Sequence, residues 1–124
     1  MILMDGESTT IQASIACYNY ETYGSRLEEG KSYSLSNFKI YKNKSDYKVS
    51  EHEYKIYFAK YTSLKVCQDL VVPPYEIKFM SFNKILAEEC DPSLLIDIIG
   101  EVVEYSVVEV ANKQTINLKL YDTV

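Results

Sequence analysis

The stretch from residue 31 to residue 65, KSYSLSNFKIYKNKSDYKVSEHEYKIYFAKYTSLK, combines β-strand patterns with a concentration of lysine and tyrosine. It carries eight lysines against three acidic residues, in a chain whose net charge is −5. It also holds six of the twelve tyrosines. Cations follow a phosphate backbone and flat rings stack on unpaired bases, so the stretch is a candidate for binding single-stranded nucleic acid. A solvated, tyrosine-rich sheet with lysines guarding its edges is the alternative explanation of the same composition.

The pattern inside this stretch predicts strands joined by a polar turn. Residues 31–42 alternate between apolar and polar side chains, but the phase changes at Ser36 and Asn37, which predicts a β-bulge. Residues 43–46 (NKSD) have the composition of a turn. Residues 47–49 predict a short strand, and the clear alternation of residues 53–59 predicts another.

The flanking regions continue the β pattern with one helical interruption. Residues 9–15 alternate as a half-buried strand does, with Gln12 and Ser14 on one face. Residues 17–27 predict one or two turns of helix, which end before Gly30.

The C-terminal half begins with a connector. Residues 68–93 contain Pro73 and Pro74, which exclude a central strand. Residues 94–110 predict a long strand that bends or takes a bulge at Gly100, and residues 115–121 predict a further strand. The chain is therefore predicted to be mostly antiparallel β with one short helix, and a small barrel is its natural closure.

Several classes of protein are disfavoured by composition. Cys17, Cys67 and Cys90 are far apart and lack a C-x-x-C spacing, and His52 is the lone histidine, so neither a disulfide framework nor a metal site is predicted. The four glycines are scattered and form no phosphate-binding loop. We therefore expect no enzyme activity and no cofactor. No apolar run approaches the roughly 18 residues of a membrane span, and the N-terminus lacks the features of a signal peptide.

An ordered set of segments resembles the large subunit of replication protein A, and most of all the plant replication-protein-A-like OB-fold domains. The segments are IQASI at 11–15, LEEGKSYSLSNFKIYKNKSDYKV at 27–49, HEYKIYF at 52–58, LLIDIIGEVVEY at 94–105 and LKLYDT at 118–123. The resemblance implies tandem OB folds that bind single-stranded DNA in the nucleus, in replication, repair or recombination. It also implies partner subunits of the replication protein A type.

The resemblance also assigns candidate binding residues. Tyr47 falls where the family has a base-stacking aromatic residue, whereas Ala16 falls at the second stacking position and Gln12 at a basic one. Tyr41 and Tyr57 are further stacking candidates. The lysines expected to follow the nucleic-acid backbone are Lys39, Lys42, Lys44, Lys48 and Lys55.

Matched to the five strands of an OB fold, the chain presents them in a permuted order. Residues 1–67 would supply the tail of strand two, strand three, the helix, and strands four and five. Residues 68–93 would form the connector. Residues 94–124 would supply strands one and two of a following domain. We expect residues 94–121 to complete the barrel, either within one chain as a monomer or between two chains as a strand-swapped dimer. The form within one chain is favoured, because the connector is long enough to fold back.

Two functions remain open at this stage. The first is a module that binds single-stranded DNA, with RNA as the alternative ligand. The second is an OB-fold domain that binds other proteins and has lost DNA binding, which Ala16, Gln12 and the acidic total charge favour.

Overall fold

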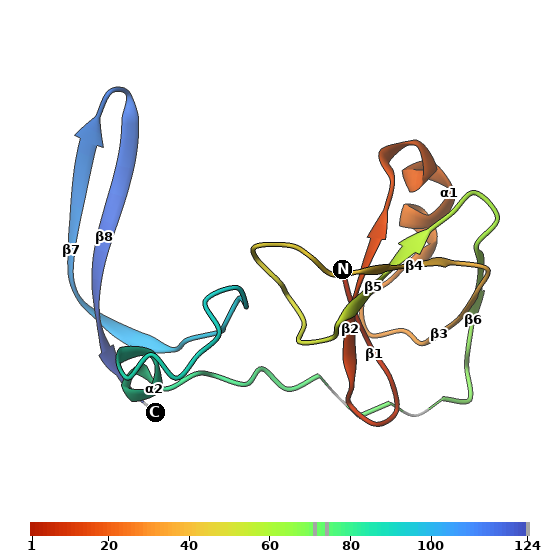
Figure 1. The fold of residues 1–124 in the computed structure, drawn as a ribbon, viewed down its shortest axis with the longest axis horizontal. Coiled ribbons are helices and arrows are strands. Elements are labelled where there is room, and N and C mark those ends of the chain that lie inside the picture. Colours follow the sequence, from red (N-terminus) through yellow and green to blue (C-terminus); the bar gives the residue numbers. More distant parts are fainter. Residues whose placement is uncertain (71, 74, 124) are drawn as a thin grey trace. The chain divides into compact units, whose positions relative to one another are not determined.

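The structure, a computed structural model, describes residues 1–70, 72–73 and 75–123. The mostly β character predicted from the sequence is confirmed (Figure 1). The predicted connector contains Val71 and Pro74, which lie outside the described residues, as does Val124 in the predicted third segment. The three predicted segment boundaries stay a prediction.

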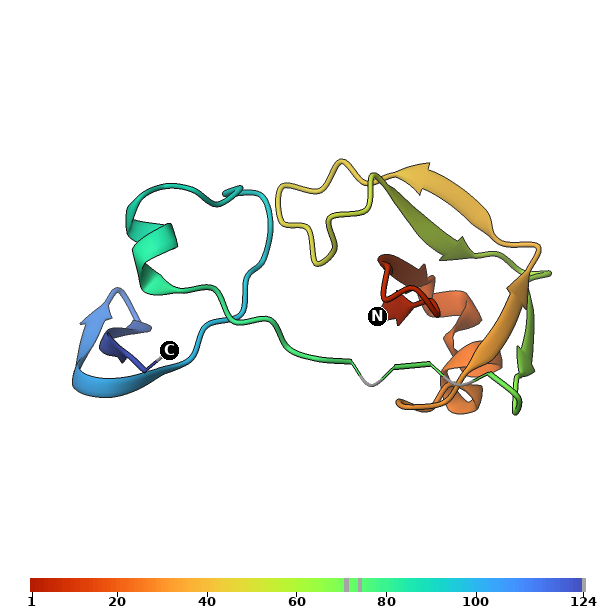
Figure 2. The ribbon, with the colours of Figure 1, turned by 90° about the horizontal axis from the view of Figure 1, so that it is seen from below.

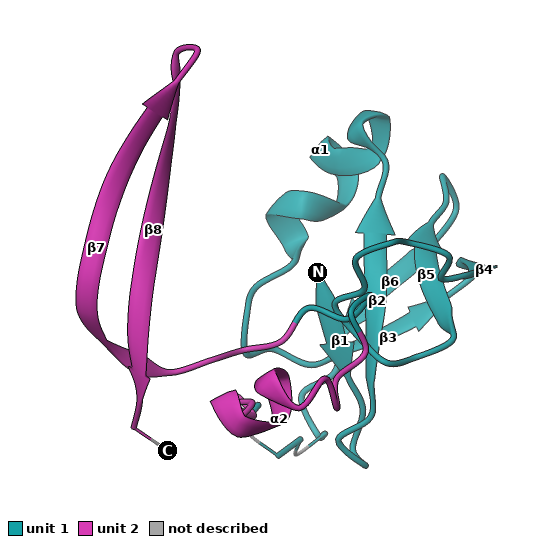
Figure 3. Ribbon diagram, turned by 60° about the vertical axis from the view of Figure 1, so that its left-hand side comes forward, with its two compact units in different colours: residues 1–76, 92–95 teal, residues 77–91, 96–124 magenta. Residues whose placement is uncertain are grey.

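The chain divides into two compact units (Figure 3). Unit 1 comprises Met1–Glu76 with Pro92–Leu95, and unit 2 comprises Ile77–Asp91 with Ile96–Val124.

Unit 1 contains two sheets and a short helical segment. Its elements are β1 (Ile2–Met4), β2 (Thr10–Ile15), η1 (Cys17–Asn19), α1 (Tyr20–Tyr23), η2 (Gly24–Arg26), β3 (Tyr33–Ser36), β4 (Lys39–Lys42), β5 (Tyr54–Phe58) and β6 (Ser63–Val66). One sheet has the order β1-β2-β5-β4, and the other pairs β3 with β6. β2 and β5 are parallel, whereas the other pairs are antiparallel. Figure 2 shows β4 in amber beside β5 in olive green.

The predicted irregularity in residues 31–42 divides the strand into β3 and β4. Asn37 lies at the division with a φ of 57°, a left-handed conformation that asparagine tolerates better than most residues. β4 pairs with β5 and β3 pairs with β6, and the chain also turns between β5 and β6. The Thr62 side chain joins the two corners, because its hydroxyl accepts from the Ala59 N–H at 2.8 Å and donates to the Asn37 carbonyl at 3.0 Å. A bent pair of strands is what a small, strongly curved barrel requires.

The predicted helix is confirmed as the continuous segment η1-α1-η2, and Tyr23 anchors it to the sheets. Tyr23 is buried and its ring lies edge-on to Phe58, with centroids 5.2 Å apart. Its hydroxyl lies 2.9 Å from the carbonyl oxygens of both Ala59 and Thr62, so it satisfies backbone groups of the β5–β6 corner. The buried core is made of Ala13, Tyr23, Ile56, Phe58 and Leu64.

One local prediction in unit 1 is wrong, and one strand was not predicted. Residues 47–49 form no strand, because the backbone of Lys48 bonds instead to Ser93 and Leu95, at 2.6 and 2.7 Å. β6 was not predicted, because a segment of four residues is too short to show a clear alternation. Its strand conformation depends on pairing with β3.

Unit 2 contains α2 (Phe82–Leu86), β7 (Gly100–Val110) and β8 (Lys113–Asp122). β7 and β8 form a two-stranded antiparallel hairpin. Its turn is Ala111 and Asn112, with φ values of 50° and 61°, which suit the tight turns of β-hairpins. The Phe82 N–H donates to Asp122 Oδ2 at 3.0 Å, which ties α2 to the end of β8.

The predicted strand at residues 94–110 begins later than expected, at Gly100. Backbone groups of the preceding residues are already used, since the Leu95 N–H bonds to Lys48 and the Asp97 carbonyl accepts from Met80. The described residues form no closed barrel, because β7 and β8 make a sheet of their own. Completion of the barrel by these strands therefore stays a prediction.

Candidate nucleic-acid interface

Four of the predicted site residues lie together on the outer face of the β4–β5 ladder. In this register Lys39 is opposite Tyr57, and Tyr41 is opposite Lys55. Successive side chains of a strand point to opposite faces, so these four share the face that the buried Ile56 does not. The sequence identified the residues, and the register brings them together.

The two tyrosines form the centre of this face. Their ring centroids are 6.1 Å apart and the planes are nearly perpendicular, at 88°, so each ring restricts the other. The Tyr41 side chain is exposed and Tyr57 is half-buried. With a lysine directly across from each ring, the face offers two aromatic surfaces beside two ammonium groups. This arrangement can stack bases and neutralise phosphates at the same time.

β2 extends the same face with polar, uncharged side chains. Gln12 is in register with Lys55, and Ser14 with Tyr57. The Gln12 side chain accepts a hydrogen bond from Asn43 Nδ2 at 3.3 Å, which gives it a structural role. Ser14 was not among the predicted site residues. The alternation of β2 placed it on a polar face, but its place beside Tyr57 follows from the parallel pairing, which the sequence does not reveal.

The loop at residues 43–53 carries Tyr47, the main predicted stacking residue. Tyr47 is 73% exposed, and Lys44 in the same loop is exposed as well. The base of the loop is closed by a hydrogen bond of 2.8 Å from the Asn43 N–H to the Glu53 carbonyl. The structure therefore presents Tyr47 to solvent on an anchored loop.

Tyr47 and Ala16 lie at opposite ends of the sheet. The loop that carries Tyr47 precedes β5, whereas Ala16 follows β2, and these two strands run parallel. An aromatic ring at position 16 would therefore mark the far end of a binding surface that runs along the strands. It would not pair with Tyr47.

The remaining two predicted lysines, Lys42 and Lys48, take part in other interactions. Lys42 Nζ lies 3.4 Å from Glu53 Oε1 in an exposed ion pair, so part of its charge is compensated. Lys48 is half-buried at the point where its backbone pairs with Leu95. Lys55 is half-buried too, but it shares the β4–β5 face with Lys39 and the two tyrosines, and Lys44 is exposed. Lys39, Lys44 and Lys55 are therefore the stronger candidates for phosphate contacts.

His52 has a structural position at the end of the loop. Its Nδ1 accepts a hydrogen bond from the Tyr54 N–H at 3.0 Å, and its ring lies edge-on to the Tyr54 ring. Across the described ranges there is no group of three or more His, Cys, Asp or Glu residues that could hold a metal ion. Within the same ranges, no helix has the length and apolar character needed to cross a membrane.

Comparisons with known proteins agree with this description. The family model of DUF223, a domain of unknown function, matches residues 1–88. No match is found among curated protein sequences. Among solved structures, the chain is similar to one chain of a replication protein A heterotrimer bound to ssDNA, with a TM-score of 0.58 and 24% sequence identity. The match covers 98% of the present chain but 29% of the other, and it supports an OB fold.

Proposed function

The chain belongs to the DUF223 family as an OB-fold domain of the replication protein A type, and we propose that it binds single-stranded DNA. The observation that carries the proposal is the outer face of β4 and β5, where two tyrosines and two lysines alternate across the strands. OB folds bind oligonucleotides on one sheet face and on adjoining loops. The exposed loop with Tyr47 adjoins this sheet.

In the proposed mechanism, unpaired bases stack on Tyr47 and on the rings of Tyr41 and Tyr57. Each stacked base contributes about 1–3 kcal/mol. Lys39, Lys44 and Lys55 follow the phosphates, and Lys42 and Lys48 contribute less. None of these contacts depends on base identity. The affinity is therefore expected to fall steeply with rising salt concentration and to vary little with base sequence.

The proposed biological setting follows from the same similarity. The related structure is a heterotrimer bound to ssDNA, which supports single-stranded DNA over RNA and supports subunits of the replication protein A type as partners. We place the chain in the nucleus, in DNA replication, repair or recombination, as a binding module without catalytic activity. The chain spans 29% of the length of the related protein, so these assignments belong to the proposal.

A protein-binding OB domain without DNA binding is the alternative function. Two observations favour it: Gln12 is engaged by Asn43 instead of carrying a positive charge, and Ala16 provides no ring. The two functions differ in their response to the removal of positive charge from the β4–β5 face.

The test is a double substitution on that face. The double variant Lys39→Gln with Lys55→Gln should bind fluorescent oligo-dT more weakly. The slope of log affinity against log salt concentration should also become less steep, by about 0.7 for each phosphate that a lysine no longer neutralises. The control is Lys113→Gln with Lys119→Gln, which changes the net charge equally but on the hairpin. If both pairs have the same effect, the β4–β5 face is not the binding surface.

A further inference from the structure

The loop that carries Tyr47 is hydrogen-bonded to a segment from much later in the chain. The Lys48 N–H donates to the Ser93 carbonyl at 2.6 Å, and the Lys48 carbonyl accepts from the Leu95 N–H at 2.7 Å. The two bonds form a parallel bridge between Lys48 and Leu94. Figure 2 shows the loop in yellow beside this segment in cyan. Both sides of the bridge lie within unit 1.

The segment Pro92–Leu95, here called the returning segment, is a short return of the chain to unit 1. The residues before it, Ile77–Asp91, and after it, Ile96–Val124, belong to unit 2. Shortly after it, the Asp97 carbonyl accepts from the Met80 N–H at 2.8 Å, within unit 2. The match to the DUF223 model ends at residue 88, before the returning segment begins. The bridge therefore joins the loop to residues outside the matched part of the chain.

Other hydrogen bonds hold the two ends of the loop. At its base, the Asn43 N–H donates to the Glu53 carbonyl at 2.8 Å. Farther along, the buried Ser50 hydroxyl donates to a backbone carbonyl of β2 at 2.7 Å. Tyr47 lies between these two anchors, and the bridge at Lys48 fixes this middle part of the loop.

The bridge orients the backbone next to Tyr47. A peptide group is planar, so the bond from the Lys48 N–H orients the whole plane that begins at the Tyr47 Cα. The bond to the Lys48 carbonyl orients the following plane in the same way. The Tyr47 side chain is 73% exposed, so packing contributes little to its position and the backbone contributes more. A residue held in place before binding loses less conformational entropy when a base stacks on it.

We propose that the returning segment positions Tyr47 for base stacking. This role rests on the proposed function, because it concerns the same DNA-binding site. Ser93 and Leu95 act through the backbone of Lys48 and are positioning residues. Without the bridge, the loop would hold the binding-competent arrangement for a smaller fraction of the time. The apparent affinity falls in proportion to that fraction.

The first experiment removes one bond of the bridge in the full chain. Leu95→Pro eliminates the N–H that donates to Lys48, and should weaken binding to labelled oligo-dT about 3- to 30-fold. Leu95→Ala keeps this N–H, and the Leu95 side chain is 56% exposed. Leu95→Ala should therefore bind within about twofold of the unmodified chain. Equal losses in the two variants, or no loss in Leu95→Pro, would overturn the proposal.

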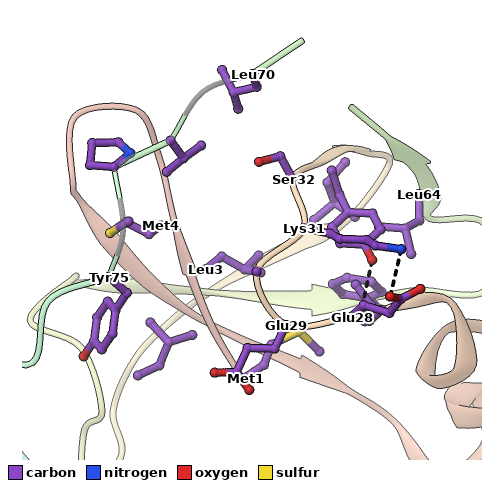
Figure 4. Close-up of a pocket in the computed structure, with 18 residues that line it drawn as sticks. Met1, Leu3, Met4, Glu28, Glu29, Lys31, Ser32, Leu64, Leu70 and Tyr75 are labelled. Carbon is purple, nitrogen blue, oxygen red and sulfur yellow. Dashed lines mark hydrogen bonds and ion pairs between the residues drawn. The ribbon is translucent and has the colours of Figure 1, made fainter. Parts of the chain in front are cut away.

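Two controls separate the bridge from a general effect of proline or of lower stability. Ile96→Pro makes the same change at the next residue, whose N–H bonds to no other described residue. Leu3→Ala shortens a side chain of β1 that lines a cavity of about 840 Å³ in unit 1 (Figure 4). The described lining of this cavity includes no residue of the loop at 43–53 or of the returning segment.

Leu3→Ala should lower the melting temperature, because it removes apolar contacts with the core. Both controls should nevertheless bind oligo-dT within about twofold of the unmodified chain. A loss in either control as large as that in Leu95→Pro would mean that the bridge has no specific role, and would overturn the proposal.

A double-mutant cycle tests whether the returning segment acts through Tyr47. In the Tyr47→Ala background, Leu95→Pro should change the affinity by less than about twofold, because the ring that the bridge positions is absent. As a single change, Leu95→Pro should cost no more affinity than Tyr47→Ala does. Additive losses would mean that the segment affects binding by another route, which would overturn the positioning role.

Hydrogen exchange tests the bridge in the absence of DNA. The Lys48 amide should be protected in the unmodified chain, and Leu95→Pro should accelerate its exchange about fivefold or more. Binding of oligo-dT by a chain whose Lys48 amide is unprotected would overturn the positioning role and leave the proposed function standing. Absence of oligo-dT binding, with this amide protected, would overturn the proposed function and the positioning role with it.

Discussion

Replacement of Tyr47 by alanine tests the loop contribution to binding. The side chain is 73% exposed on the loop at residues 43–53, so its removal should change the free energy of unfolding by less than about 0.5 kcal/mol. Loss of one stacked base should cost about 1–3 kcal/mol, which corresponds to an affinity loss of about 5- to 140-fold. The assay is fluorescence anisotropy with labelled oligo-dT at low salt, alongside a thermal melt of each variant.

Tyr105→Ala is the matched control for this change. Tyr105 is 70% exposed, and it lies on β7 in unit 2, outside the sheet and the loop that are proposed to bind DNA. Its replacement should leave the affinity within about twofold of the unmodified chain, since surface changes away from a site are usually small. Equal losses from the two variants, or no loss from Tyr47→Ala, would refute the stacking role of the loop.

Three further changes test other parts of the account. Joint replacement of Lys42, Lys44 and Lys48 by glutamine should reduce the slope of log oligo-dT affinity against log salt concentration, by about 0.7 for each phosphate left without a lysine. An unchanged slope would mean that other residues bind the phosphates. Ala16→Phe should strengthen binding by adding a ring at the far end of the surface, and no gain in a folded variant would show that this end is unused. Tyr23→Phe should lower the free energy of unfolding by about 1–3 kcal/mol in urea titrations, because buried carbonyls lose their donor; unchanged stability would refute that role.

Alternation along the sequence predicted much of the fold. β2, β5 and β8 lie inside or close to the predicted ranges, and the phase change at Asn37 marked the division between β3 and β4. Alternation reports which face a side chain occupies, but not which strand lies beside it. β6 and the late start of β7 depend on pairing with distant segments, so they could not be found in this way.

The same limit applies to the candidate site. Composition identified the lysines and tyrosines between residues 39 and 57, and the family resemblance identified Tyr47. The grouping of Lys39, Tyr41, Lys55 and Tyr57 on one face depends on the β4–β5 register. The weaker positions of Lys42 and Lys48 depend on an ion pair and a backbone bridge that form in the folded chain.

The most direct test of the proposed function is the affinity of the unmodified chain for oligo-dT at two salt concentrations. Three phosphate contacts, from Lys39, Lys44 and Lys55, predict a slope of about −2 in log affinity against log salt, and thus an affinity loss of about 20-fold between about 50 and about 200 mM salt. The account predicts measurable binding at the lower concentration with this steep decline. Absence of binding at low salt, or an affinity that salt leaves unchanged, would contradict a nucleic-acid function for this domain.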